Sequence, residues 1–461
     1  MTRERVVLKT YLLSNTVIFM CNTVPVFLLV NVILCVFLSC DNNEGSNRID
    51  AKPGKDSVDA AFIVNQKVHR EQDTSAIVIN TDTGRFHMVP HHIALKKGVE
   101  LDLNIPEGYN ISVAAEGLKR LRFLRKSPDG RLFATGMFDK SDNKRGCVYV
   151  FSGWNDSTHQ FQKIYSFLNG LHNPNQIAFY NKNDSSFIYV AETERLCYYV
   201  YRSEDTVATG APIVVANFPD YGLDYKYGGW HLTRSIAFHN NKLYVSVGSS
   251  CNACIEKEDV RATILEMNPD GTGQKIFASG LRNSVGIKWI GNQLWATSMG
   301  RDLIGPDKPE DLLLHVQRGI YYHWPFYYQY QNHIYPDDQM QDTAKKNHTI
   351  IPPTPPLAFA GFKAHSAPLG IDYFQHFDDP GLKNALLVAL HGSTSVWRQR
   401  GNAIVKANGG NKYTDVVNGF LAGKKENGRK GRPCDVLMND SKSFFFTDDH
   451  NGVLYYVWKE Y

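Results

Sequence analysis

The chain has 461 residues, of which 43% are hydrophobic and 12% aromatic, enough for a large core, and this composition excludes an intrinsically disordered protein. Lysine and arginine number 50 against 46 aspartates and glutamates, and the basic residues are scattered rather than gathered in one block or on one helix. No nucleic-acid partner is therefore expected, and the aromatic content favours strands.

The N-terminal residues 1–40 differ in composition from the rest of the chain. Three basic residues precede an apolar run from about Tyr11 to Ser39, which is typical of an export or anchoring segment. A run of roughly 30 residues would also suffice for a transmembrane helix, which needs about 20. Leu38-Ser39-Cys40 resembles a bacterial lipoprotein cleavage site, which would place a lipid on Cys40. The segment is predicted to be a lipoprotein or cleaved signal, or else an uncleaved membrane anchor.

The next segment, residues 41–73, is polar and poor in aromatic side chains. Such a stretch cannot bury enough apolar surface to fold alone, so it is predicted to be a flexible tether. The folded domain is predicted to occupy residues 74–461. Whether residues 1–40 are a cleaved signal, a lipoprotein signal or a membrane anchor, the domain is expected outside the cytoplasm, in the cell envelope or periplasm.

The predicted domain repeats one pattern, in which an apolar strand leads through a polar turn into a second strand that ends in small or polar residues. Most units continue into a third strand, such as "CVYVF" or "TILEM". The six units span 122–138, 175–193, 234–249, 285–299, 369–393 and 434–449. Six units at intervals of roughly 50 to 80 residues indicate an all-β, six-bladed β-propeller, in preference to a pair of β-sandwiches or a solenoid.

The upstream segment 101–118 contains a further strand, which is predicted to complete the last blade and so close the ring from its N-terminal side. Three insertions, 205–230, 303–365 and 406–431, are predicted to be loops at the channel mouths, where function usually resides.

Polar residues stand at the start of the innermost strand of every unit. Because these strands line the channel of a propeller, the residues before them are expected to meet at one mouth. They are Arg122, Asn173 and Asn175, His231 and Arg234 (in "GGWHLTRSIAF"), Arg282 and Asn283, His365, and Arg432. A single arginine at a strand entry most often braces a loop. Several cations aimed at one small volume, however, repel one another unless an anion or a metal-bound ligand lies between them.

Eight cysteines are present, of which Cys21, Cys35 and Cys40 belong to the leader. The spacing of Cys251 and Cys254 lacks the second pair of ligands that a structural zinc site needs. A local disulfide is the preferred interpretation, with a redox pair as the alternative. Asp448 and Asp449 are predicted to bind turn amides rather than a metal.

Several motifs in this order and spacing carry a family resemblance: "HLTRSIAF…LYVSVGSSCN", "ASGLRNSVGIKW", "RDLIGPDKPEDLL", "YYHWP", "AHSAPLGIDYF", "HGS" and "GRPCDV…FFFTDDHNGVLYYV". The chain from about 101 to 458 resembles the glucose/sorbosone dehydrogenases, six-bladed propellers that use pyrroloquinoline quinone (PQQ) and calcium. Within that family it looks closest to the sorbosone or pyranose dehydrogenase branch.

The resemblance implies specific roles at the mouth. His231 matches the catalytic histidine, the general base that takes a proton from the sugar hydroxyl while hydride passes to the quinone. Arg282, Asn283 and Arg432 match cofactor-binding residues, to which the converging Arg122, Arg234 and His365 are added. The carbonyls of Gly305 and Pro306 match the ligands of a catalytic Ca²⁺.

Two positions depart from the family pattern. One is His323, where a glycine is common, and this change alters the backbone freedom beside the site. The usual "HGSWNR" is here "HGSTSVWRQR", so the basic partner near the quinone is His391, Arg398 or Arg400. Tyr322 and Trp324 occupy an aromatic segment that forms either a wall of the cofactor site or part of the core.

Three functions remain open on the sequence alone. The first is PQQ- and Ca²⁺-dependent oxidation of an aldose or pyranose-type sugar, with electrons passed to an external acceptor. The second is a non-catalytic envelope propeller that binds a glycan or a protein partner. The third is a metal-dependent hydrolase of the lactonase kind, which the arginine-rich strand entries disfavour.

Overall fold

A computed structural model describes residues 77–219, 231–393, 400–422 and 428–460. The predicted leader (1–40) and tether (41–73) lie outside these ranges, as does Arg398. Within them, no helix is both long and apolar enough to cross a bilayer.

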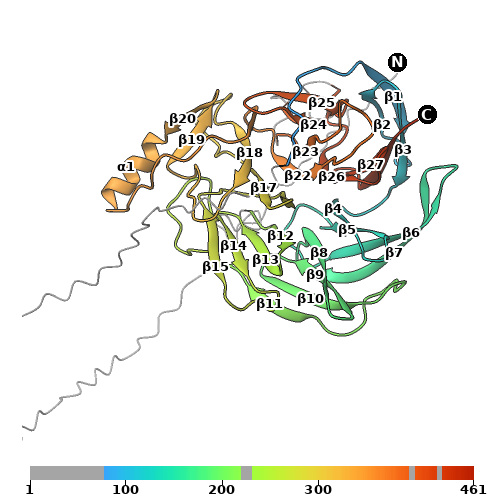
Figure 1. Ribbon diagram of the computed structural model, residues 1–461, viewed down its shortest axis with the longest axis horizontal. Helices are drawn as coiled ribbons and strands as arrows, with labels where there is room; N and C mark the ends of the chain where they lie inside the picture. Colours follow the sequence, from blue (N-terminus) through green and yellow to red (C-terminus); the bar gives the residue numbers. More distant parts are fainter. Residues whose placement is uncertain (1–76, 220–230, 394–399, 423–427, 461) are drawn as a thin grey trace, which may run out of the picture. The chain divides into compact units, whose positions relative to one another are not determined.

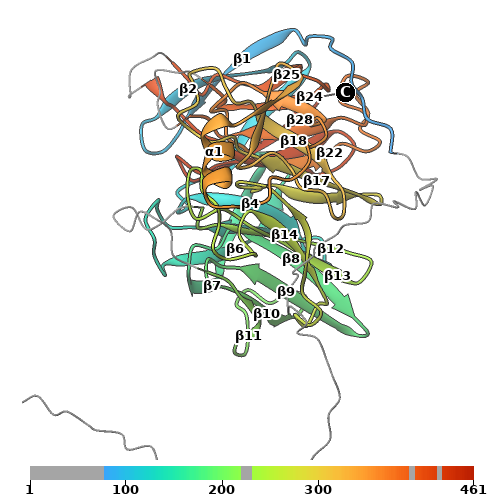
Figure 2. The ribbon, with the colours of Figure 1, turned by 90° about the vertical axis from the view of Figure 1, so that its left-hand side faces the viewer.

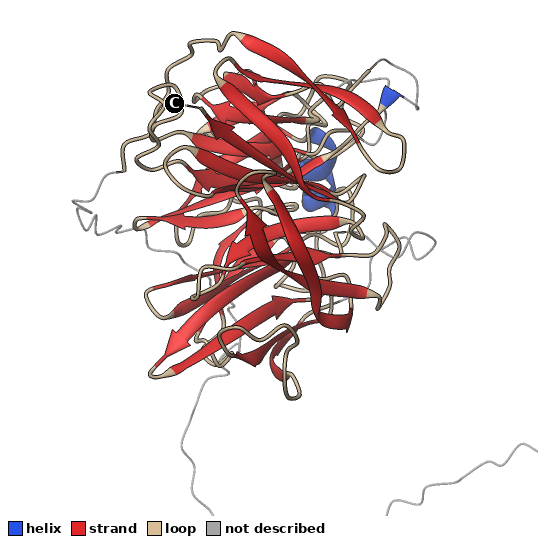
Figure 3. Ribbon diagram, turned by 90° about the vertical axis from the view of Figure 1, so that its right-hand side faces the viewer, coloured by secondary structure: helices blue, strands red, loops and turns tan. Residues whose placement is uncertain are grey.

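The described chain forms six four-stranded antiparallel sheets, the blades of a propeller, as predicted (Figure 1). Strands and loops account for nearly all of it (Figure 3). Blade 1 consists of β4 (Leu121–Lys126), β5 (Leu132–Gly136), β6 (Gly146–Asn155) and β7 (Gln160–Leu171). Blade 2 consists of β8 (Gln176–Lys182), β9 (Ser185–Ala191), β10 (Arg195–Tyr201) and β11 (Ile213–Asn217). Blade 3 consists of β12 (Arg234–His239), β13 (Lys242–Val247), β14 (Thr263–Met267) and β15 (Lys275–Ser279).

The second half of the ring repeats this arrangement. Blade 4 consists of β16 (Ile287–Ile290), β17 (Gln293–Ser298), β18 (Asp311–Val316) and β21 (Ala360–Phe362). Blade 5 consists of β22 (Pro368–Tyr373), β23 (Leu386–Leu390), β24 (Ala403–Ala407) and β25 (Tyr413–Val417). Blade 6 consists of β26 (Pro433–Met438), β27 (Ser443–Asp448), β28 (Val453–Lys459) and β3 (Tyr109–Ala115).

The ring closes through β3, as the sequence predicts. This strand comes from the N-terminal side of the domain and pairs with β28, from Lys459↔Tyr109 to Leu454↔Ala115. The innermost strands β4, β8, β12, β16, β22 and β26 touch one another in cyclic order. A further ribbon, β1 (Met88–Ala94) with β2 (Glu100–Pro106), lies beside β25, where Asn104 bridges Asn418 (Figure 2).

Local sequence explains how successive strands turn back on one another. Between β12 and β13, Asn240 and Asn241 both adopt positive φ (47° and 54°), as a two-residue hairpin turn requires. The central strands that follow are buried on both faces, and apolar clusters fill the spaces between neighbouring blades.

Hydroxyl groups fix one blade to the next near the centre. At four of the six junctions, a serine or threonine of the second strand donates a hydrogen bond to a carbonyl at the inner strand of the following blade. These bonds are Thr135 to Asn175 (2.6 Å), Ser246 to Ser284 (2.6 Å), Thr297 to Leu369 (3.0 Å) and Thr447 to Arg122 (2.7 Å). They help to position four of the six strand entries, near which predicted site residues stand.

The insertions carry more structure than predicted. Segment 205–230 contributes β11 to blade 2, and 406–431 contributes β25 to blade 5. Segment 303–365 supplies β18 and β21 to blade 4, and between them the hairpin β19 (Tyr327–Tyr330) and β20 (His333–Pro336) and the helix α1 (Asp338–Lys346). The interpretation of these segments as loops was wrong, because each contains short strands that pair with the neighbouring strand of the same blade.

An apolar plug fills the centre of the ring below the strand entries. It consists of Phe123, Val285, Leu369 and Cys434, from blades 1, 4, 5 and 6, with Met299 packed against them. The predicted polar site residues lie directly above this plug; Asn283, for example, contacts Met299.

Candidate functional site

The predicted polar residues lie at one end of the ring, here called the mouth. Inner strands begin there and, because the sheets are antiparallel, second strands end there. The structure gathers these residues into two clusters. The His231 cluster contains His231, Arg282, Asn283, Asp302 and His365; the Asp449 cluster contains Arg120, Arg122, His391, Arg432 and Asp449.

His231 is held in one orientation at the mouth. Its Nδ1 lies 2.9 Å from the backbone carbonyl oxygen of Ser249 and 2.9 Å from the Ser249 hydroxyl, which itself donates to the Cys251 carbonyl. A carbonyl can only accept, so Nδ1 carries the proton and Nε2 keeps its lone pair. Burial and then the charge of Arg282 hold the pKa of His231 well below its usual 6.5. The imidazole is therefore a neutral base.

Gly248 lets His231 and Asn283 approach each other. A Cβ at Gly248 would lie 2.6 Å from the His231 Cβ and 2.8 Å from the Asn283 Oδ1. Since real Cβ atoms do not make such contacts, only glycine fits between these side chains. The Asn283 amide also donates to the Met299 sulfur at 3.5 Å, which places it on the plug.

Arg282 is fixed by Asn252, a residue that the sequence analysis missed as a site residue. The guanidinium donates to the carbonyl (3.0 Å) and the side-chain oxygen (3.0 Å) of Asn252 and to the Gly300 carbonyl (3.1 Å). Asn252 also exchanges two hydrogen bonds with the Asp302 backbone and accepts one from Trp324. Burial lowers the pKa of Arg282 to about 10, so it stays charged at neutral pH.

The predicted calcium ligands lie beside this cluster. The Gly305 carbonyl oxygen is 3.3 Å from Nε2 of His365, and Nδ1 of the same imidazole is 3.2 Å from the Asp302 carboxylate. Asp302 also lies 3.7 Å from Arg282 and is half-exposed. A carbonyl and a carboxylate are the oxygen donors that Ca²⁺ prefers. Gly305 and Asp302 therefore offer oxygen atoms of the kind that such an ion binds, on either side of the His365 imidazole, while no described contact fixes the role of Pro306.

The second cluster is centred on a buried carboxylate, Asp449. It accepts from Arg120 (2.9 Å), Arg122 (2.8 Å) and Nε2 of His391 (2.7 Å). Burial alone would raise its pKa, yet His391 and the two arginines hold it well below the usual value. Burial lowers the pKa of His391 to about 3, so the neutral ring donates its proton to Asp449. The prediction that Asp449 binds turn amides was wrong.

Asp448, by contrast, does bind turn amides, accepting from the backbones of Arg432, His450 and Asn451. Successive side chains at a strand end point to opposite sides, so the two aspartates face different surroundings. Arg432 donates to the carbonyls of His391 and Gly392.

Positive charge exceeds negative charge around Asp449. Loss of solvent, followed by the charges of Arg432 and Arg120, lowers the pKa of Lys140, so these cations lie within electrostatic reach of one another. The pKa of Arg432 is likewise lowered to about 10. Burial is the main cause, and the positive charges of the neighbouring Arg429, Arg120 and Arg122 add to it. Asp449, even with Asp139 near Arg120, does not balance this set, so the mouth suits a ligand with several carboxylates, as PQQ has.

Other predicted residues have structural partners. Arg234 is buried and donates to the carbonyls of His231 (2.8 Å), Thr233 (3.0 Å) and Pro219 (2.6 Å), which braces the His231 turn. His231 has a φ of +49°, an uncommon conformation for a residue with a side chain. Asn175 accepts from Arg122 and donates to Ser235, and Asn173 bonds to Asn143 and Asp142.

The aromatic segment belongs to the core. The Tyr322 hydroxyl donates to the His315 carbonyl and accepts from the Gln317 amide, and only 1% of the residue is exposed. Trp324 packs against Cys251 and Cys254. Of the alternatives to His391, Arg400 forms an ion pair with Asp307.

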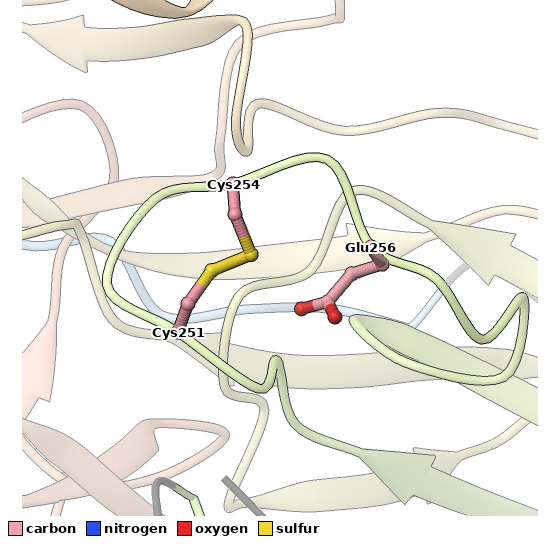
Figure 4. A group of neighbouring side chains, drawn as sticks. All are labelled: Cys251, Cys254 and Glu256. Carbon is pink, nitrogen blue, oxygen red and sulfur yellow. A yellow bond between two sulfur atoms is a disulfide. The ribbon is translucent and has the colours of Figure 1, made fainter. Parts of the chain in front are cut away.

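The expected disulfide joins Cys251 and Cys254 (Figure 4). Among the described side chains, three potential metal ligands come together only here, with Glu256. Because the two sulfurs are bonded to each other and Glu256 accepts from Ser250, the group is a structural turn. The turn carries Ser249 and Asn252, and so it holds both His231 and Arg282.

Comparisons with known proteins bear on this fold. No protein-family model matches the sequence. An uncharacterized protein of Borreliella burgdorferi is 29% identical over 231 residues, which cover 48% of this chain and 58% of that relative. The chain thus matches little more than half the length of this relative.

Solved structures share the six-bladed fold. The PQQ domain of pyranose dehydrogenase from Coprinopsis cinerea, in its holo form, aligns with a TM-score of 0.61 at 15% identity, over 79% of this chain and 98% of that one. The calcium structure of a family AA12 carbohydrate-active enzyme from Trichoderma reesei gives 0.61 at 16% identity, over 83% and 100%. PQQ-bound aldose sugar dehydrogenase from Streptomyces coelicolor gives 0.51 at 18% identity, over 77% and 99%. At this identity the likeness establishes the fold.

Proposed function

We propose that this protein is a quinoprotein that oxidises a sugar hydroxyl, with His231 as general base and with PQQ and Ca²⁺ as cofactors. The observation that carries the proposal is the combination at one mouth of a partly buried neutral imidazole with an excess of arginine and lysine. The names of the structures that share the fold, which mention PQQ and calcium, agree with it.

In such a reaction, the residues at the mouth would have three separate roles: general base, cofactor binding and ion binding. When bound, PQQ would supply an electrophilic quinone that accepts hydride, and Ca²⁺ would polarise the quinone carbonyl. His231, with its proton fixed on Nδ1, accepts the hydroxyl proton at Nε2. Arg120, Arg122 and Arg432 would offset the carboxylate charge of the cofactor. Arg282 and Asn283 would lie against it, and Gly305 with Asp302 would supply oxygen ligands to the ion.

A titration tests this proposal directly. Purified protein with Ca²⁺ is titrated with PQQ by calorimetry, and the reduction of an external electron-acceptor dye is followed with a panel of sugars. His231→Ala is expected to take up PQQ as wild type does while its kcat falls roughly 10²- to 10⁴-fold. Absence of PQQ uptake by the wild-type protein would exclude the proposal.

We also propose an extracytoplasmic location, with membrane association through residues 1–40 or a lipid on Cys40. The Cys251–Cys254 disulfide supports an oxidising compartment. Fractionation of cells that express wild-type and Cys40→Ser protein tests the lipid: the variant should leave the membrane fraction if Cys40 carries the anchor.

A further inference from the structure

A cleft of about 890 Å³ lies at the outer part of blades 4 and 5 and is distinct from the mouth clusters. Five segments of the chain line it: residues 83–88 up to the start of β1, the loop after β17, the β19–β20 hairpin, β21 with Lys363, and Arg400 with residues 408–418 around β25. Its volume falls within the roughly 300–1,000 Å³ of ligand sites. We call it the blade 4–5 cleft.

The inner end of this cleft adjoins the proposed site. Asp307 and Arg400, which pair with each other, both line it. Asp307 follows Gly305 by two positions, and the Gly305 carbonyl contacts His365 of the His231 cluster. A second hollow of about 250 Å³ shares Arg400, Tyr413 and Asn418 with the cleft and extends to Gly401 and Asn402 at the mouth. A chain-like ligand could thus run from the mouth outward.

The lining suits a neutral polyhydroxylated ligand. Four cations and three carboxylates face the cleft, so no strong potential favours an anion. Phe86, Tyr330 and Tyr413 are half-buried and offer ring faces, and Tyr413 is held by ring contact with Phe362. Aromatic faces bind the C–H faces of sugar rings, and the neighbouring amide side chains can both donate and accept.

Glu310 adds a specific requirement for donors. It is 7% exposed and accepts only from the Gln331 amide (3.0 Å) and the Gln329 side chain (3.2 Å), with no cation paired to it among the described residues. Its carboxylate lies over Gly361, another residue of the cleft lining, where a Cβ would lie 2.3 Å from Oε2, so the glycine lets the carboxylate sit at the cleft wall. A buried carboxylate with spare acceptor capacity is stabilised by hydroxyl donors.

We propose that the blade 4–5 cleft binds the non-reacting units of a neutral oligosaccharide, whose terminal unit reaches the mouth. The substrate class is then a glycan chain rather than a free monosaccharide. This assignment rests on the proposed function for turnover, but binding in the cleft does not require the cofactor.

The test is calorimetry on the full-length protein without PQQ. The probes are glucose and the cello- and malto-oligosaccharides up to the tetraose, with an oligogalacturonide as the acidic counterpart. At least one neutral tetraose is expected to bind about tenfold more tightly than glucose. Tyr413→Ala and Glu310→Gln should abolish that gain. The control is Tyr335→Ala, which should keep it, because Tyr335 is an exposed tyrosine of the β19–β20 hairpin that does not line the cleft.

Equal affinity for glucose and every tetraose, or tighter binding of the oligogalacturonide, would overturn the assignment. So would a gain with length that both variants retain while their thermal unfolding is unchanged. Length-dependent binding without PQQ uptake would support the cleft and exclude the quinoprotein. PQQ-dependent oxidation with the same KM for glucose and tetraose would keep the enzyme and exclude the cleft.

Discussion

Asn252 links two members of the His231 cluster, Arg282 and Asp302, by hydrogen bonds, although an amide side chain is neither an acid, a base nor a nucleophile. It grips Arg282 through its carbonyl and side-chain oxygens, and it fixes the Asp302 backbone. His231 could be found from the sequence because it stands at a strand entry within a familiar motif. Asn252, Asp302 and Asp449 could not be assigned in this way, because their roles depend on partners that lie far away in the sequence.

Replacing Asn252 by alanine should therefore weaken PQQ uptake about tenfold. The change removes the side-chain acceptor for Arg282 and Asp302, at a cost of about 1–3 kcal/mol for polar groups left unpaired. Asn252→Asp, which keeps the acceptor oxygens, should recover part of the affinity. A PQQ titration measures this, with Asn181→Ala, an exposed asparagine of β8, as the matched control. Wild-type uptake by Asn252→Ala would refute the positioning role.

The pH profile reports on His231. Burial and the charge of Arg282 lower its pKa well below 6.5, so the imidazole remains an unprotonated base as the pH falls past that value. The kcat/KM for sugar oxidation should therefore stay level at pH 6.5 and fall only at more acidic pH. An acid limb centred at or above pH 6.5 in steady-state assays would contradict this environment.

Among the elements, the turn between β27 and β28 shows why some features could be predicted and others not. The alternating apolar and polar pattern predicted the strands, and the position of segment 101–118 predicted closure. Gly452, in the turn, has a φ of +68°, and a Cβ there would lie 1.8 Å from the Leu118 carbonyl oxygen. This close approach joins the last blade to the residues after β3. Helix α1 and the β19–β20 hairpin escaped prediction because their segments lack a long apolar pattern.

Gly452→Ala should destabilise the propeller more than an alanine at an unobstructed glycine. Gly130→Ala is the matched control, because Gly130 has a φ of +82° with nothing within 4 Å of its Cβ position. Both variants have the backbone cost of about 1 kcal/mol, but only Gly452→Ala adds a clash with backbone. Thermal unfolding compares them, and equal melting temperatures would show that the contact at Leu118 carries no strain.

At the scale of the whole molecule, Asp435 lies where three inner strands meet. Its carboxylate accepts from the Leu124 amide of β4 at 2.8 Å, and a Cβ at Gly370 of β22 would lie 1.9 Å from its other oxygen. Burial raises its pKa from 3.8 to about 7. The order of the blades could be predicted from their repeats, but a carboxylate shared by three blades could not be, because each strand reveals only its own neighbours.

The pH dependence of stability should include this group. The folded state holds a proton on Asp435 that the unfolded chain releases near pH 4, so its contribution is complete below about pH 4 and is lost as the pH rises through about 7. Asp435→Asn keeps an acceptor for Leu124 and removes the titration. Its melting temperature should change less between pH 5 and pH 8 than that of wild type. Parallel curves for the two proteins would contradict the raised pKa.

The pairing of β3 with β28 also constrains how the protein is made. Among the blade strands, β3 is made before all the others, and its partner β28 is made after them. Until β28 has been made, β3 has no neighbour in blade 6 and the ring stays open. Blade 6 is therefore the last sheet that a newly made chain can complete, even when the other blades have already formed.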